Sequence, residues 1–185
     1  MLEFITYWGL HFSVISLITS YFAAKENHIY YHRRLAIITM ELALIINIIT
    51  AFLYWFVVYD EMTVKYKWDE PKGRKILIHL SFLHLIPLAT TLINFLISNV
   101  AFVEGDWKYQ FYVIFLYGII NYLITEITGK AVYSLLPWEN YKSPMLILIF
   151  LIFGVFLHIM LTKLSHIIKK GTSPDMEERL LDQRE

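Results

Sequence analysis

The stretch of sequence that decides the fold covers residues 35–59 and reads LAIITMELALIINIITAFLYWFVVY. It contains one acidic residue, Glu41, and no basic residue. A helix of about 20 such residues, rising about 1.5 Å per residue, crosses the roughly 30 Å hydrocarbon core of a membrane. Four further apolar stretches of similar length lie at residues 4–23, 76–98, 110–127 and 145–164. The sequence therefore predicts a polytopic membrane protein with about five spans.

Helical bundles and closed β-barrels are the structures that can span a membrane, because unpaired backbone groups are costly in lipid. A barrel is excluded because the five stretches are continuously apolar and lack the two-residue alternation of barrel strands. The composition is 57% hydrophobic and 17% aromatic, which leaves too little polar surface for a soluble domain. We therefore predict an all-α transmembrane bundle over residues 1–168, followed by a charged tail over residues 169–185.

Residue counts exclude several classes of function. The chain has no cysteine, so disulfides, cysteine-based zinc sites and thiol nucleophiles are ruled out. Lysine and arginine together number 16, as do aspartate and glutamate, and no basic run is dense enough to bind nucleic acid. We expect no cofactor and no metal ion, and the lipid bilayer is the first expected partner. The basic residues of the loops divide evenly between the two sides of the membrane and give no orientation.

Small and polar residues recur three or four positions apart in four of the five stretches. This spacing puts them on one face of each helix, and in a membrane such a face meets another helix. We expect the helices to bury these stripes centrally and to turn their aliphatic faces to lipid or to a partner. The four stripes are Thr6, Gly9, Ser13, Ser16 and Ser20; Ala36, Thr39, Ala43, Asn47 and Thr50; His84, Pro87, Thr91, Asn94 and Ser98; and Gly118, Asn121, Thr125 and Thr128.

Ionisable residues inside spans are costly in lipid, so each is a candidate functional residue. For Glu41 we favour a protonated or hydrogen-bonded contact between helices, with His158 as a suitable partner, and the alternative is proton or ion handling. For the histidines we favour hydrogen bonds between helices. The topology sorts these buried polar candidates into His79, His84 and Glu126 on the side where Thr6 lies, and Glu41 and His158 toward the opposite side.

Four short blocks follow one another in an order that a known family shows. They are Phe4-Ile5-Thr6-Tyr7, similar to Phe-Leu-Thr-Phe; Tyr54-Trp55 with Tyr59-Asp60-Glu61, similar to an aromatic span end with Tyr-Asp-Arg-Glu; His79 to Pro87, similar to Asn-His-x-x-His-Thr-x-x-x-Pro; and Thr128-Gly129-Lys130-Ala131-Val132-Tyr133, similar to Thr-Gly-x-x-Val-Tyr-Pro. In these blocks the chain resembles the androgen-inducible membrane hydrolase family.

Members of that family are intramembrane threonine hydrolases, which cleave fatty-acid esters of hydroxy fatty acids with a threonine nucleophile and a histidine base. The resemblance puts Thr6 at the nucleophile position. Counted back from Pro87, the position of the catalytic histidine is occupied by Phe82, and His79 matches the first, noncatalytic histidine of the motif. His79 lies about 60° around a helix from position 82, whereas His84 lies about 160° away. A hydrolase would therefore use Thr6 and His79 as its catalytic pair.

The leading hypothesis from the sequence is a noncatalytic accessory subunit of a larger membrane complex, such as a respiratory-chain complex, built on this hydrolase-like fold. Phe82 would then fill the space of the missing histidine, and Thr6 would have no side-chain partner. Helix faces and a tail helix beginning at Ser173, with Leu180 and Leu181, would bind other membrane subunits, which favours the mitochondrial inner membrane over the endoplasmic reticulum. The alternatives are the intramembrane threonine hydrolase and a small transporter.

Overall fold

The structure is a computed structural model that describes residues 5–25, 30–98, 100–133 and 135–169. The described part of the chain consists of helices and connections without a strand, which confirms the prediction of an all-α bundle. The expected tail helix at Ser173 lies outside the described residues, as do Leu180 and Leu181. The helices are α1 (Ile5–Lys25), α2 (Tyr30–Leu53), η1 (Tyr54–Val58), α3 (Tyr59–Lys65), α4 (Pro71–Ile97), η2 (Glu104–Asp106), α5 (Trp107–Thr128) and α6 (Lys142–Ile168).

Four segments among the described residues are long and apolar enough to cross a membrane: Tyr30–Lys65, Pro71–Ile97, Glu104–Thr128 and Lys142–Ile168. The first of them joins α2, η1 and α3 into one continuous helix. Helix α1, which is 21 residues long, is not among them. The described bundle therefore has four candidate spans and, in α1, a fifth long helix.

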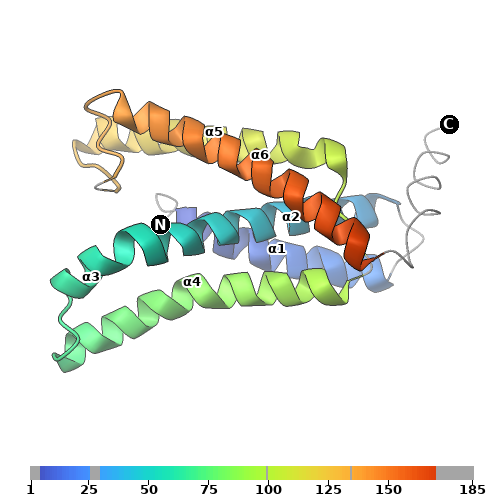
Figure 1. The fold of residues 1–185 in the computed structure, drawn as a ribbon, viewed down its shortest axis with the longest axis horizontal. Coiled ribbons are helices and arrows are strands. Elements are labelled where there is room, and N and C mark those ends of the chain that lie inside the picture. The colour runs from blue at the N-terminus through green and yellow to red at the C-terminus, as the bar shows by residue number, and fades with distance from the viewer. Residues whose placement is uncertain (1–4, 26–29, 99, 134, 170–185) are drawn as a thin grey trace.

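Helix α2 lies at the centre of the bundle and contacts each of the other four long helices. Helices α5 and α6 lie together on one side of α1 and α2, and α4 lies on the other side (Figure 1). Contacts between Thr19 and Thr39 and between Ser13 and Asn47 show that α1 and α2 are antiparallel. Most of the side chains of α2 are consequently buried, whereas the outer helices expose a broad aliphatic surface.

The small and polar stripes meet in the middle of the bundle, as the sequence predicts. The Asn47 amide donates to the Ser13 hydroxyl at 2.7 Å, and the Asn94 amide donates to the Ser20 hydroxyl at 3.1 Å. Gly9 allows α1 to approach α2 here, since a Cβ atom at this position would come within 2.5 Å of Asn47 Oδ1. Hydrogen bonds of this kind hold helices together where lipid offers no hydrophobic driving force.

The two ends of the bundle differ, and we name them by their connections. The cavity end comprises the start of α1, η1, α3, the first half of α4 and residues 129–141 between α5 and α6. The connection end comprises residues 98–106 between α4 and α5, the first half of α2 and the last turns of α6. The sequence-predicted polar residues divide between these two ends.

Candidate functional site

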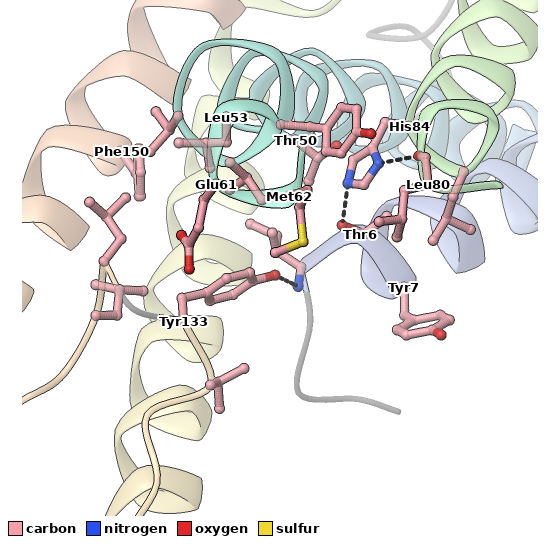
Figure 2. A pocket seen from close by; sticks show the side chains of 18 of the residues that line it. Thr6, Tyr7, Thr50, Leu53, Glu61, Met62, Leu80, His84, Tyr133 and Phe150 are labelled. Carbon is pink, nitrogen blue, oxygen red and sulfur yellow. Dashed lines mark hydrogen bonds between the residues drawn. The ribbon is translucent and has the colours of Figure 1, made fainter. Parts of the chain in front are cut away.

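A cavity of about 640 Å³ lies at the cavity end. Its wall is mainly apolar and is built from α1, the α2–η1–α3 helix, α4, one side chain each of α5 and α6, and the loop residues Val132, Tyr133, Leu135 and Leu136 (Figure 2). This volume is in the range of sites that bind small ligands. The hydroxyl of Thr6 and the imidazole of His84 line the cavity together.

Thr6 and His84 form a hydrogen bond between α1 and α4. Thr6 Oγ1 lies 3.1 Å from His84 Nε2, and His84 Nδ1 lies 2.7 Å from the carbonyl oxygen of Leu80. Because a carbonyl oxygen can only accept, the imidazole proton resides on Nδ1, and the unprotonated Nε2 accepts the hydrogen of the Thr6 hydroxyl. This is the arrangement in which a histidine acts as a general base toward a hydroxyl nucleophile.

The imidazole of His84 is held in place by a second contact. The ring of Tyr54 stacks on it with a centroid distance of 4.0 Å and an interplanar angle of 7°, and the Tyr54 hydroxyl bonds Ser81 at 3.2 Å. Tyr54 opens η1, a π-helical segment. Such segments are rare and are often found at functional sites. The ring stack and the Leu80 carbonyl together fix both the plane and the tautomer of the base.

Tyr133 completes the site from residues 129–141. Its hydroxyl accepts the backbone N–H of Ile5 at 3.1 Å and also interacts with the hydroxyls of Thr6 and Tyr117. Burial raises the pKa of Tyr133 above its usual value, so the phenol stays neutral at physiological pH. Tyr133 appears in the sequence only within the Thr-Gly block, and nothing in that block indicates that it meets Thr6.

His79 is not the partner of Thr6, so the pair that the sequence assigns to a hydrolase does not form, as the accessory-subunit hypothesis expects. The side chain of His79 is exposed, as is that of Phe82 at 56%, so Phe82 does not fill a space beside Thr6. The inward face of α4 includes Leu77, His84 and Pro87. His79 is five residues, or about 140°, away from His84 around the helix and therefore points outward. The expectation that Thr6 has no side-chain partner is also wrong, because that partner is His84.

Glu126 was expected to be buried, and its side chain is exposed. The buried face of α5 contains Tyr117, Asn121 and Thr125. Glu126 follows Thr125 by one residue, which turns it by about 100° around the helix and away from this face. Glu126 therefore contributes nothing to the cavity.

Glu41 and His158 are buried at the connection end, with 2% and 1% of their surface exposed, as the sequence predicts. They do not pair directly. The backbone N–H of Val103 donates to Glu41 Oε1 at 2.7 Å, and His158 Nε2 lies 3.0 Å from the carbonyl oxygen of Val103, to which it donates. The expected Glu41–His158 contact is thus replaced by a contact of each with the same residue of the connection.

Two basic residues bind the same connection. Arg34 holds Asp106 through both guanidinium nitrogens, with Nη1 at 2.5 Å from Oδ2. Lys169 Nζ donates to the carbonyl oxygen of Phe95 at 2.9 Å and to that of Val100. Burial lowers the pKa of Lys169 to about 8. The carbonyl oxygens that accept its hydrogen bonds lie near the C-terminus of α4, where a positive charge is favourable.

The described residues contain no group of three or more histidine, aspartate or glutamate side chains that could hold a metal ion. At the cavity end a hydroxyl, an imidazole and a phenol meet from three different segments. Comparison with known proteins adds nothing to this description, since no family model, curated protein or solved structure matches the chain.

Proposed function

We propose that this protein is an intramembrane hydrolase of fatty-acid esters, with Thr6 as the nucleophile and His84 as the general base. One observation carries the proposal: the Thr6 hydroxyl donates to the free Nε2 of His84 beside a largely apolar cavity. A threonine hydroxyl alone is a weak nucleophile, and an adjacent base is what activates it. The site has this base within 3.1 Å.

The geometry supports a two-step acyl transfer. His84 Nε2 takes the hydroxyl proton as Thr6 Oγ1 bonds to the ester carbonyl carbon, and the carbonyl oxygen becomes an oxyanion. The oxyanion collapses, the bond from carbon to the leaving oxygen breaks, and the leaving alkoxide receives the proton from His84. Water then attacks the acyl-threonine with the help of the same base, which releases the fatty acid and restores the Thr6 hydroxyl.

The cavity supports a lipid substrate rather than a polar one. Its wall includes Leu53, Val57, Leu83 and Phe150, which suit an acyl chain. Two charged residues of α3, Glu61 and Lys65, also line it and are exposed. An ester with a free carboxylate, such as the hydroxy fatty-acid esters that the family resemblance implies, would place its chain against the apolar wall and its charge near Lys65.

The accessory-subunit hypothesis remains a prediction. Its sequence argument was the phenylalanine at position 82, and the Thr6–His84 contact weakens that argument because another histidine occupies the base position. Membership of a respiratory-type complex, a mitochondrial location and docking through the tail depend on the same hypothesis. Native electrophoresis after mild detergent extraction tests it, because an accessory subunit migrates with a large complex and shows no turnover.

The proposed function is tested by assaying purified protein with a fluorogenic fatty-acid ester and a fluorophosphonate probe. We expect Thr6→Ala to lower turnover by about 10³-fold or more and to abolish labelling, and Thr6→Ser to retain part of the activity because it keeps a hydroxyl. Thr63→Ala is the matched control, since the Thr63 hydroxyl bonds the carbonyl of Asp60 in its own helix at 2.8 Å. Equal turnover in wild type and Thr6→Ala would refute the proposal.

A further inference from the structure

A chain of hydrogen bonds leads from α5 and residues 129–141 to the nucleophile. We propose that its last member, the Tyr133 hydroxyl, is the oxyanion donor of the site, and that Tyr117 positions this hydroxyl. The inference rests on the proposed hydrolase function, because an oxyanion forms only if Thr6 attacks a carbonyl. Five contacts and one unusual backbone conformation carry it.

The first contacts place Tyr133 beside the nucleophile. Its hydroxyl accepts the N–H of Ile5, the residue directly before Thr6, at 3.1 Å, and it interacts with the Thr6 hydroxyl itself. Figure 2 shows the phenol reaching across the cavity end to the start of α1. The oxyanion of a tetrahedral intermediate forms next to the oxygen that attacks, so a donor in contact with Thr6 Oγ1 is within reach of it.

The remaining contacts set the direction of the hydrogen bonds. Trp138 Nε1 lies 2.7 Å from Asn121 Oδ1, and Asn121 Nδ2 lies 3.2 Å from the Tyr117 hydroxyl. An indole nitrogen can only donate, which fixes the orientation of the Asn121 amide and makes Asn121 a donor to Tyr117. Tyr117 bonds the Tyr133 hydroxyl in turn. Every bond in the series can therefore point the same way, toward Thr6.

The bonds of the Tyr133 oxygen show where its own proton goes. A phenol oxygen has two acceptor positions and one hydrogen. The N–H of Ile5 occupies one acceptor position, and the hydroxyl of Tyr117 can occupy the other. The Tyr133 hydrogen then points to Thr6, which is its further partner. Donors aligned in series polarise one another, so the last hydroxyl is a stronger donor than an isolated phenol.

The backbone at Trp138 is an independent sign that this series is functional. Trp138 has a φ of 60°, in the left-handed region that bulky residues rarely adopt. Its N–H is held by the Ser143 hydroxyl at 2.9 Å, and its indole reaches back to Asn121. Residues in such conformations are strained and cluster at active sites, where the surrounding structure holds them.

The test is the effect of Tyr133→Phe on turnover of the fatty-acid ester by the full-length protein. This change keeps the ring and removes the hydroxyl, so we expect kcat to fall by about 10²- to 10³-fold while KM changes by less than about threefold. Tyr141→Phe is the matched control, because Tyr141 belongs to the same connection and is 74% exposed. It should leave both constants at the wild-type values.

A double-mutant cycle separates positioning from structural support. Tyr117→Phe should lower kcat by about tenfold on its own, and it should have little further effect in a Tyr133→Phe background, because it acts through Tyr133. If Tyr133→Phe fails to fold, difluorotyrosine incorporated in place of Tyr133 serves instead. Its more acidic phenol should ionise earlier, so turnover should be lost at a lower pH than in wild type, and an unchanged pH profile would overturn the proposal.

The outcomes distinguish this inference from the proposed function. If Thr6→Ala abolishes turnover while Tyr133→Phe keeps kcat within about threefold of wild type, the protein is a hydrolase and Tyr133 is not its oxyanion donor. If the wild-type protein shows no turnover and no labelling that depends on Thr6, both proposals are wrong. Loss of kcat in Tyr133→Phe with a preserved KM and fold supports the assignment.

Discussion

At the connection end, Glu41 and His158 both bind the backbone of Val103, whereas at the cavity end Thr6 and His84 bind each other beside an open space. Both ends bury polar groups in a bundle whose outer surface is aliphatic. The difference lies in the partner. At the connection end each side chain is bonded to a fixed backbone group, whereas a hydroxyl and a base that meet at a cavity can exchange a proton with a molecule that enters it.

The connection end needs its polar side chains for a structural reason. The described residues of this connection are largely irregular, and Phe102 and Asp106 among them are buried, where an unpaired N–H or C=O is costly. The Phe102 N–H donates to the Ser165 hydroxyl at 3.0 Å, and the Val100 carbonyl accepts from Lys169. Glu41 from α2 and His158 from α6 bind Val103, so side chains of α2 and of the end of α6 together bind the backbone of this connection. Proton or ion handling is therefore not needed to explain a buried glutamate here.

The largest effect should follow from removing the base at the cavity end. We expect His84→Ala to lower kcat/KM by about 10²- to 10⁴-fold, the usual contribution of a general base. In wild type, Nε2 must be unprotonated to accept the Thr6 proton, so activity should be lost as the pH falls and the imidazole becomes protonated. A pH profile of ester hydrolysis checks both points.

The matched control for this change is His79→Ala, because His79 lies on the same helix and is exposed. It should retain wild-type activity and the same acid limb. If His79→Ala instead loses activity and His84→Ala retains it, His79 is the base and the contact between Thr6 and His84 has no catalytic role.

A large effect on stability, without an effect on catalysis, should follow from breaking the ion pair at the connection end. Asp106→Ala leaves the guanidinium of Arg34 without its carboxylate, and we expect a loss of about 3 kcal/mol in unfolding free energy. This is the lower end for a buried pair, because the Arg34 side chain is still 19% exposed. Denaturation in mixed micelles gives the stability, and turnover per folded molecule should stay unchanged.

Replacing both partners, as in Arg34→Met with Asp106→Leu, should recover most of that stability because no unpaired charge remains. A double variant as unstable as Asp106→Ala would mean that the ion pair does more than neutralise a buried charge. A fall in turnover per folded molecule would mean that the two ends are coupled.

The residue pattern predicts more of the cavity end than the family motif does. The stripe through Thr6 and the stripe through His84 both follow helical spacing, and the two stripes face each other in the bundle. Counting back from Pro87 along the motif leads instead to Phe82 and His79, which point outward. Helical spacing also accounts for Glu126, which follows the buried residue Thr125 by one position and is exposed for that reason. Periodicity, a local property of the chain, was the better guide to orientation.

The cavity and the partners of the connection could not be predicted in this way. The cavity depends on where η1, α3 and the loop residues Val132, Tyr133, Leu135 and Leu136 lie around the start of α1, and the sequence contains no signal for a π-helical segment at Tyr54. The partner of Glu41 is a backbone N–H, and any residue but proline at position 103 could supply it. Sequence reasoning therefore proposed a side chain, His158, where the structure uses a peptide group.

The smallest change in stability should follow from Glu41→Gln at the connection end. Glu41 accepts the Val103 N–H at 2.7 Å and also interacts with the carboxyl of Asp106. Glutamine reproduces both contacts, since its carbonyl oxygen can accept from Val103 and its amide can donate to Asp106. We expect the unfolding free energy to change by about 1 kcal/mol or less, the worth of one neutral hydrogen bond.

Glu41→Leu is the informative control for this change. Leucine is similar in size to glutamate, but it has no oxygen to accept the hydrogen bond of the Val103 N–H. Such a loss costs about 1 to 3 kcal/mol, so the leucine variant should be clearly less stable than the glutamine variant. Both variants and wild type should be equally inactive in a proton-flux assay in sealed vesicles. A pH-dependent flux that is present in wild type and absent in Glu41→Gln would assign Glu41 to transport, and it would remove the contrast between the structural end and the reactive end of the bundle.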